Sequence, residues 1–340
     1  MNIGRGRAVN KKRWWALGIF VLLLVVWSVS SKETPINKSK ASSSLLGYIN
    51  VDENSRALAT QVFRQGKGKT LAMIKLEGTI MDDSSTDSYI NKTYNHQVFL
   101  KQLKDVFARD DIKGIVLQVN SPGGGVYESD EIYTHIMDLK ARYPKPLVVY
   151  MGQTAASGGY YISMAADKIY ANRNTLTGSI GVIISTYNYK QLADNIGIQD
   201  ITFKSGEQKD LLNPMRPVSE EDAAIMQSIV NESYGYFVDV VTKGRHMDRS
   251  KVLELADGRI YSGPQAKTLG LVDEVGYLDQ AIEATANLAN TSDPQILLYE
   301  YSGSDLLTWL NSVKAPSFDL LGLTQQIDRD FSTKVMYLAK

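Results

Sequence analysis

The chain contains no cysteine and only three histidines among its 340 residues. Without cysteine it can form no disulfide, no thiolate zinc site, no cysteine-bound iron–sulfur cluster and no thiol nucleophile. Three histidines also leave little room for a histidine-rich metal site. The 37 Lys and Arg residues balance 37 Asp and Glu residues, which argues against binding of bulk nucleic acid. Any hydrolytic chemistry in this chain is therefore expected to use an oxygen nucleophile.

Several well-known catalytic signatures are missing as well. The sequence contains no G-x-S-x-G, no S-x-x-K and no H-E-x-x-H. The segment from Gly66 to Thr70 resembles the end of a phosphate-binding loop, but Phe63 stands where the earlier glycine is required. A nucleophilic serine would then need a lysine as its base, and a lysine can serve only where burial lowers its pKa.

The N-terminal segment is basic and then apolar. Residues 1–13 hold five Lys or Arg and no acid, and residues 14–31 carry no charge. As a helix this uncharged run is about 27 Å long, close to the thickness of a bilayer's hydrocarbon core. The positive-inside rule predicts a single-pass anchor in the cell membrane, with the N-terminus in the cytoplasm and the rest of the chain outside. A cleaved signal peptide ending near Ser30 is the less favoured alternative.

Alternating strand and helix patterns predict an α/β domain over residues 70–289. Short apolar runs, typical of buried strands, occur at 71–76, 115–119, 147–150 and 168–171. Helical spacing or capping signals occur at 99–107, 126–142, 158–166, 219–242 and 279–288. The alternation is typical of βαβ units around a largely parallel sheet.

The segments on either side of this domain are less patterned. Residues 32–69 are expected to form an extracytoplasmic stalk, with a helix over 55–65. Residues 290–340 are expected to form a C-terminal appendage. Within it, residues 335–339 are apolar and end in Ala339, much like a peptide substrate. We therefore consider two alternatives for this tail, which lies either in an active-site groove, where it could be trimmed, or elsewhere.

Two loops that follow predicted strands carry the candidate chemistry. Residues 120–125 contain three consecutive glycines before a helix, so they form either an oxyanion site or simply a tight turn. Residues 153–159 place the hydroxyl of Ser157 where the next helix begins. A serine there is usually an N-cap, although a nucleophile with its oxyanion donors would use the same position. Spacing alone favours the cap.

Four motifs in one order resemble the signal peptide peptidase A family, which is peptidase family S49. They are Asn-Ser-Pro-Gly-Gly at 120–124, Ala-Ala-Ser-Gly-Gly-Tyr-Tyr at 155–161, Thr-Gly-Ser-Ile-Gly-Val at 177–182 and Lys-Ser-Gly-Glu-Gln-Lys-Asp at 204–210. The resemblance spans residues 70–288 and is to the half-length, Gram-positive-type form. It implies a ClpP/crotonase-like fold of repeated ββα units after one transmembrane helix. It also implies a serine protease that degrades remnant signal peptides.

The resemblance also implies a role for each matching residue. Ser157 matches the nucleophile and Lys209 the general base of a Ser–Lys dyad, and Ser179 matches the serine that orients the lysine. Gly124 and Gly158 match the backbone donors of the oxyanion hole. No metal or cofactor is implied. The implied partners are peptide substrates, the membrane and further copies of the chain, in a homo-oligomeric ring whose active sites are completed between protomers.

An alternative function stays open at this point. The same fold hosts acyl-CoA chemistry through a similar glycine-rich oxyanion loop, so fold alone does not fix the activity. The chain could therefore be an acyl-CoA-type enzyme or an inert membrane scaffold. A hydratase would place glutamates around the site, whereas Ser157, Ser179 and Lys209 stand here at protease positions.

Overall fold

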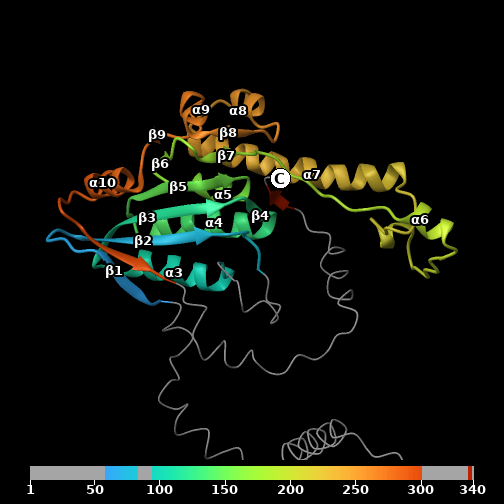
Figure 1. The fold of residues 1–340 in the computed structure, drawn as a ribbon, viewed down its shortest axis with the longest axis horizontal. Coiled ribbons are helices and arrows are strands. Elements are labelled where there is room, and N and C mark those ends of the chain that lie inside the picture. Colours follow the sequence, from blue (N-terminus) through green and yellow to red (C-terminus); the bar gives the residue numbers. More distant parts are fainter. Residues whose placement is uncertain (1–57, 83–93, 301–335, 339–340) are drawn as a thin grey trace, which may run out of the picture. The chain divides into compact units, whose positions relative to one another are not determined.

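The computed structural model describes residues 58–82, 94–300 and 336–338 (Figure 1). All of them belong to Glu53–Lys340, the second of two units into which the chain divides. Within this described part, no helix is long and apolar enough to cross a membrane. The expected cytoplasmic segment 1–13 and anchor 14–31 lie outside the described residues.

The strands of the described residues build one nine-stranded sheet and a separate strand pair. The main path of the sheet runs β1 (Thr60–Arg64), β10 (Gln295–Tyr299), β2 (Thr70–Glu77), β3 (Ile112–Ser121), β5 (Leu147–Ala156), β6 (Lys168–Ala171) and β9 (Glu274–Val275). Strand β1 is antiparallel to β10, and the strands from β10 to β9 are parallel. Off this path, β7 (Leu176–Gly178) pairs with the end of β5, and β8 (Ile260–Ser262) pairs with β7. The separate pair joins β4 (Gly123–Gly125) to β11 (Met336–Leu338).

The central strands contain continuous apolar runs because both faces of the sheet are covered. Along β2, Leu71 and Met73 pack toward Ile282 of α10 (Leu278–Leu288). The intervening Ala72 and Ile74 belong to the larger cluster on the opposite face. Such two-sided burial is the usual condition of parallel strands. It explains why the sequence showed short continuous apolar runs rather than an alternation.

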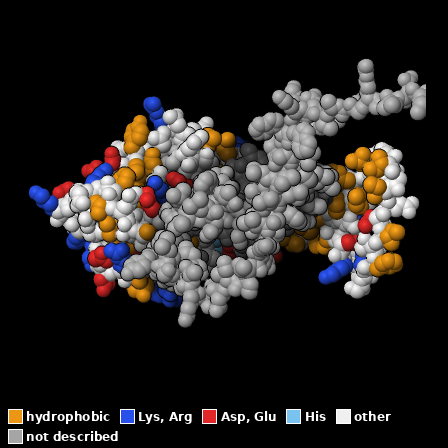
Figure 2. All heavy atoms as spheres, turned by 60° about the horizontal axis from the view of Figure 1, so that its bottom comes forward, with side chains coloured by type: hydrophobic (Ala, Val, Ile, Leu, Met, Phe, Trp, Pro, Cys, Tyr) orange, Lys and Arg blue, Asp and Glu red, His pale blue; other side chains and the backbone are white. Residues whose placement is uncertain are grey.

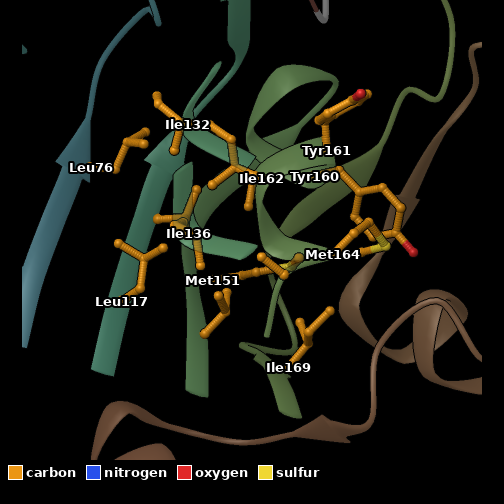
Figure 3. Close-up of a cluster of buried hydrophobic side chains, with 14 of the residues drawn as sticks. Leu76, Leu117, Ile132, Ile136, Met151, Tyr160, Tyr161, Ile162, Met164 and Ile169 are labelled. Atoms are coloured by element: carbon orange, nitrogen blue, oxygen red, sulfur yellow. The ribbon is translucent and has the colours of Figure 1, made fainter. Parts of the chain in front are cut away.

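Three helices that cover the sheet contribute to the larger cluster, together with parts of α7 (Glu220–Arg245) and α8 (Arg249–Leu255). The three helices are α3 (His96–Ala108), α4 (Val126–Arg142) and α5 (Gly158–Ser163). Figure 3 shows Leu117 and Met151 from the strands together with Ile136 and Ile162 from the helices, and all four are fully buried. Each such side chain contributes roughly 1.5–3 kcal/mol by leaving water. The junctions of β3, β5 and these helices are therefore held rigidly.

The remaining helices follow the parallel core in the chain. They are α6 (Lys190–Asn195), α7 (Glu220–Arg245), α8 (Arg249–Leu255) and α9 (Gly263–Thr268). The capping box predicted at Ser219 is present, because Ser219 and Asp222 bond reciprocally at the start of α7. The helix predicted at 126–142 has those bounds. The mixed α/β architecture is thus confirmed.

Two segments differ from the expectation. The predicted helix over 55–65 is wrong, because Thr60–Arg64 form the edge strand β1. Strand β10 lies beyond residue 289, where we expected the domain to end, and it is inserted between β1 and β2. Both strands are fixed by pairing with distant parts of the chain, which local periodicity cannot reveal. The sheet therefore includes residues assigned above to the stalk and to the C-terminal appendage.

Candidate active site

Ser157 lies between the end of β5 and the start of α5. Its backbone angles, φ 54° and ψ −119°, fall in a region that residues other than glycine rarely adopt. The residue is fully buried, and its Oγ has no hydrogen-bond partner among the described residues. The hydroxyl makes no capping bond to α5, so the N-cap interpretation is wrong for this side chain. Buried hydroxyls are normally bonded, and an unbonded one on strained backbone is typical of a functional group.

Gly124 and Gly158 come together beside this hydroxyl. A Cβ built on Gly158 would lie 3.3 Å from the nitrogen of Gly124 and 2.3 Å from Ser129 Oγ. The first N–H groups of a helix have no acceptor within that helix. In α5 the N–H of Tyr161 is the one that bonds back to the carbonyl of Ser157, at 2.9 Å. The N–H of Gly158 therefore lies at the positive end of α5, and the backbone of Gly158 packs against that of Gly124, an arrangement that is compatible with an oxyanion site.

Strand β4 is held in place by residues that the sequence analysis did not single out. The N–H of Gly125 donates to the carbonyl of Ile80 at 2.8 Å, and the N–H of Ile80 donates to the carbonyl of Gly123 at 3.0 Å. Ser121 Oγ accepts from the N–H of Gly123 at 3.1 Å. A Cβ on Gly124 would lie 1.9 Å from the carbonyl oxygen of Ile80, so only glycine fits. Ser121 could have been found within its motif, whereas nothing in the sequence marks Ile80.

Ser179 lies next to Ser157 because β5 and β7 end side by side. Ala156 pairs with Gly178, and the N–H of Ser157 donates to the carbonyl of Gly178 at 2.8 Å. Ser179 is 7% exposed and also has a positive φ, of 50°. Its N–H donates to the carbonyl of Arg259 at 2.8 Å, which fixes the turn. The structure thus brings four of the five predicted site residues, Ser157, Ser179, Gly124 and Gly158, to one place.

A cavity of about 470 Å³ opens beside Ser179. Its lining includes the backbone of Gly181 and Gly258 and the side chains of Val182, Ile183 and Tyr234. Ile183 is 40% exposed although it is apolar. The cavity can therefore accept a side chain or a loop that approaches Ser179 from outside.

Lys209, the fifth predicted site residue, lies on a different part of the molecule. Residues 187–217, which we call the arm, contain α6 and the 3-10 turn Glu207–Asp210 that carries Lys209. The N–H of Tyr189 donates to the carbonyl of Pro214 at 2.7 Å and closes the base of the arm. Lys209 is exposed, and its amine is not bonded to Ser157 Oγ, since that oxygen has no partner in the described chain. In one copy of the chain, Ser157 Oγ and Lys209 are therefore not bonded to each other.

Apolar side chains on the arm face solvent. Phe203 is 95% exposed and Ile201 is 75% exposed. Figure 2 shows hydrophobic side chains gathered on the segment around α6, at the right-hand end of the view. Further exposed apolar residues of the arm are Tyr187, Leu192, Ile196 and Ile198. An apolar surface of this kind usually marks an interaction site.

The C-terminal strand β11 pairs with β4 in antiparallel register (Figure 1). Tyr337 lies opposite Gly124, and Met336 and Leu338 lie opposite Gly125 and Gly123. On its other side, β4 is bound to Ile80. The edge of β4 that faces β11 is therefore able to hold an extended peptide by backbone pairing.

The polar groups elsewhere in the described chain do not form a metal centre. Among residues 58–82, 94–300 and 336–338, no group of three or more His, Asp or Glu side chains could hold a metal ion. His96 is buried between the hydroxyl of Tyr94, at 2.6 Å, and the carboxylate of Glu131, at 2.7 Å. This histidine is thus part of a polar contact between α3 and α4.

The chain is similar in sequence to known peptidases. The model of peptidase family S49 matches residues 140–292, which include Ser157, Ser179 and Lys209. A protein of Enterococcus faecium, provisionally named signal peptide peptidase SppA, is 36% identical over 340 residues, 97% of this chain and 98% of that protein. Protease 4 of Haemophilus influenzae is 30% identical over 251 residues, 74% of this chain and 40% of that protein. The chloroplastic serine protease SPPA of Arabidopsis thaliana is 32% identical over 221 residues, 65% of this chain and 32% of that protein.

Proposed function

We propose that this chain, which belongs to peptidase family S49 and is a serine protease, uses Ser157 as its nucleophile and Lys209 as the general base. The observation that carries the proposal is the buried, unbonded hydroxyl of Ser157, whose neighbour in the chain, Gly158, packs against the backbone of Gly124. A nucleophile next to two backbone donors is the arrangement that acyl transfer requires. No cofactor or metal takes part in this proposal.

The reaction follows from these positions. Neutral Lys209 removes the proton of Ser157 as Oγ attacks the scissile carbonyl of a peptide. The N–H groups of Gly124 and Gly158 stabilise the oxyanion, and loss of one such donor typically costs about 3–4 kcal/mol. Lys209 then protonates the leaving amine, and water hydrolyses the acyl-enzyme. Ser179 orients the amine of Lys209 as a neutral acceptor, since a carboxylate there would favour the ammonium form and spoil the base.

The lysine comes from a second copy of the chain in this proposal. In a single copy of the chain, Lys209 is exposed on the arm. Burial against a neighbouring copy would lower its pKa toward the working range. The cavity beside Ser179 offers the place, and the apolar residues of the arm offer the contact surface. Repetition of this head-to-tail contact closes a homo-oligomeric ring.

The substrate class follows from β4 and from the N-terminal sequence. An extended peptide can pair with β4 through its backbone, as β11 does, and such pairing suits unfolded segments of many sequences. The proposed anchor at 14–31 holds the enzyme in the cell membrane with residues 32–340 outside. The Enterococcus faecium relative carries, provisionally, the name signal peptide peptidase. We therefore infer that remnant signal peptides, after their release by signal peptidase, are the substrates.

Single substitutions test the dyad. With the purified full-length chain and a signal-peptide-like peptide, Ser157→Ala and Lys209→Ala should each lower kcat/KM by about 10⁴-fold or more, because the members of such a unit act together. Lys101→Ala, which removes another exposed lysine, should cleave at the wild-type rate. Substantial cleavage by Lys209→Ala would refute the lysine base.

Mixing the two inactive variants tests whether the site is shared. If copies mix at random in co-expressed oligomers, about a quarter of the sites receive an intact serine and an intact lysine, because each site takes one residue from each of two copies. Co-expression of Ser157→Ala with Lys209→Ala should therefore restore about a quarter of the wild-type activity. Mixed oligomers without activity would mean that serine and lysine act within one copy.

A further inference from the structure

Four side chains of alternating charge form a chain that begins at the lysine-bearing turn and ends at α7. They are Lys204, Asp210, Arg216 and Asp222, and we call them the charge chain. Lys204 Nζ donates to Asp210 Oδ1 at 2.8 Å and to the carbonyl of Glu207 at 2.8 Å. Lys204 therefore braces both ends of the turn Glu207–Asp210, in which Lys209 lies.

Arg216 connects this turn to the start of α7. Its Nη2 lies 3.1 Å from Asp210 Oδ1 and also donates to the Asp210 carbonyl at 3.3 Å. Its Nη1 donates to Asp222 and, at 3.1 Å, to the carbonyl of Pro217. Asp222 is 1% exposed and belongs to the capping box of α7. A planar guanidinium with several donors can hold two carboxylates at once, which a lysine cannot do with the same geometry.

Helix α7 runs from this capping box into the hydrophobic core. Its later residues Phe237, Val238 and Val241 are fully buried in the larger cluster described above. The ring of Phe237 packs on Tyr161 of α5, four residues after Ser157, with ring centroids 5.0 Å apart. The charge chain thus joins the lysine-bearing turn to the start of α7, and the later part of α7 packs on α5, the helix that follows Ser157.

The turn itself has little stability without such support. It is a four-residue 3-10 helix, and no side chain caps it. It also places the carboxylate of Asp210 next to Lys209 in the chain. Hydrogen bonds from Lys204 and Arg216 hold the pKa of Asp210 below its ordinary value, so this carboxylate stays ionised and engaged. A free Asp210 would instead be able to pair with the neighbouring ammonium and keep it charged.

We propose that Arg216 and Asp210 are positioning residues for the lysine base. Arg216 fixes the lysine-bearing turn to α7 and keeps the Asp210 carboxylate away from the amine of Lys209. This inference depends on Lys209 being the base, as proposed above. The arm carries three other carboxylates, Asp194, Asp200 and Glu207, and all three stay constant in the test.

The test compares pH profiles of kcat for the full-length chain on one peptide. Arg216→Ala should lower kcat about 10-fold or more through misplacement of the base, with KM little changed. It should also move the rising acid limb of the profile about one pH unit higher, because the freed Asp210 favours the ammonium. Asp210→Asn should move the same limb lower, because Lys204 and Arg216 then lack their counter-charge. Arg216→Lys should restore the wild-type limb and part of kcat.

The outcomes separate the two proposals. An acid limb of Arg216→Ala that coincides with the wild-type limb overturns the positioning role, even if kcat falls, since a merely structural loss lowers kcat without moving the limb. Limbs that move in the same direction in Arg216→Ala and Asp210→Asn overturn it as well. Cleavage by Lys209→Ala in the same assay would instead refute the dyad. If Arg216→Ala fails to fold, Asp210→Asn and Arg216→Lys still give the decisive comparison.

Discussion

Two phenylalanines show how differently the two halves of the proposed site are built. Phe237 lies in the body, by which we mean the sheet and the buried residues packed on its two faces, and it is fully buried. Phe203 lies on the arm and is 95% exposed. The body holds its apolar side chains away from water, whereas the arm presents them to it. The proposed nucleophile, Ser157, belongs to the body, and the proposed base, Lys209, belongs to the arm.

This difference indicates what each region needs in order to work. The body is complete in one copy: it buries its own core and strains the backbone at Ser157 and Ser179. The arm is held by polar contacts, such as Asn188 Nδ2 to the carbonyl of Arg216 at 2.6 Å, and it lacks a comparable apolar core in the described residues. Its exposed apolar residues gain stability only when another surface covers them. The arm is therefore the region that depends on assembly.

Substitution of the two phenylalanines is expected to give the largest difference between the arm and the body. Phe203→Ser should abolish peptide cleavage and reduce the oligomer, because it removes the most exposed apolar contact of the arm, and it should leave the melting temperature of dissociated chains unchanged. Phe237→Ala should instead destabilise the body by about 3–5 kcal/mol through the cavity it creates. Light scattering, thermal melting and a cleavage assay measure the three effects.

The contrary result would remove the proposed difference between the body and the arm in their dependence on assembly. If Phe203→Ser kept the oligomer and the activity, the exposed residues of the arm would have no part in assembly. Lys101→Ala on the exposed surface of α3 serves as the control that should change neither property.

Much of the body could be predicted because its signals are local. The apolar runs of β2, β3 and β5 and the helical spacing of α4 lie in short windows of sequence, and the capping box at Ser219 marks the start of α7. Strands β1 and β10 could not be placed in the same way. Each is defined by a partner more than 200 residues away, since Thr60 pairs with Tyr299 and Ile296 pairs with Leu71.

The sequence motifs named the residues of the candidate site, but they did not predict how these residues are arranged. The motifs named Ser157, Ser179, Gly124 and Gly158, and the structure brings these four together. The strained φ of Ser157 and the bonding of β4 to Ile80 have no signature in single residues. The position of Lys209 on an exposed arm also depends on tertiary structure, and the family resemblance alone suggested that the base is supplied by a neighbour.

The C-terminal strand β11 allows a further test of the body, in this case at strand β4. Because β11 pairs with β4, it occupies the edge that a substrate would use, and we expect it to compete with substrate. Deletion of residues 336–340 should raise kcat/KM several-fold while kcat at saturating peptide changes little. A chain in which these five residues are replaced by glycine and serine serves as the control for length. Equal kcat/KM in the wild type and the deletion variant would exclude competition.

The fate of the tail can be followed in the same preparations. Intact mass spectra of the wild type and of Ser157→Ala report whether the enzyme removes its own C-terminal residues. A wild-type chain shorter than that of Ser157→Ala would support trimming. Identical intact C-termini in both would remove that hypothesis and leave occupancy as the remaining role of β11.

A partly buried histidine, His135, gives the smallest expected effect and tests the body alone. His135 lies on α4, its Nε2 is buried without a hydrogen-bond partner, and burial lowers its pKa from the ordinary value of 6.5. As the pH falls through about 6.5, the unfolded chain therefore takes up this proton before the folded chain does, and stability is lost toward acid pH. His135→Gln should reduce the drop in melting temperature between pH 7 and pH 5 by about 1–2 °C. His246→Gln, at an exposed position, should keep the wild-type drop. An unchanged drop in His135→Gln would mean that this histidine reaches solvent freely and that the body is looser around α4 than its burial indicates.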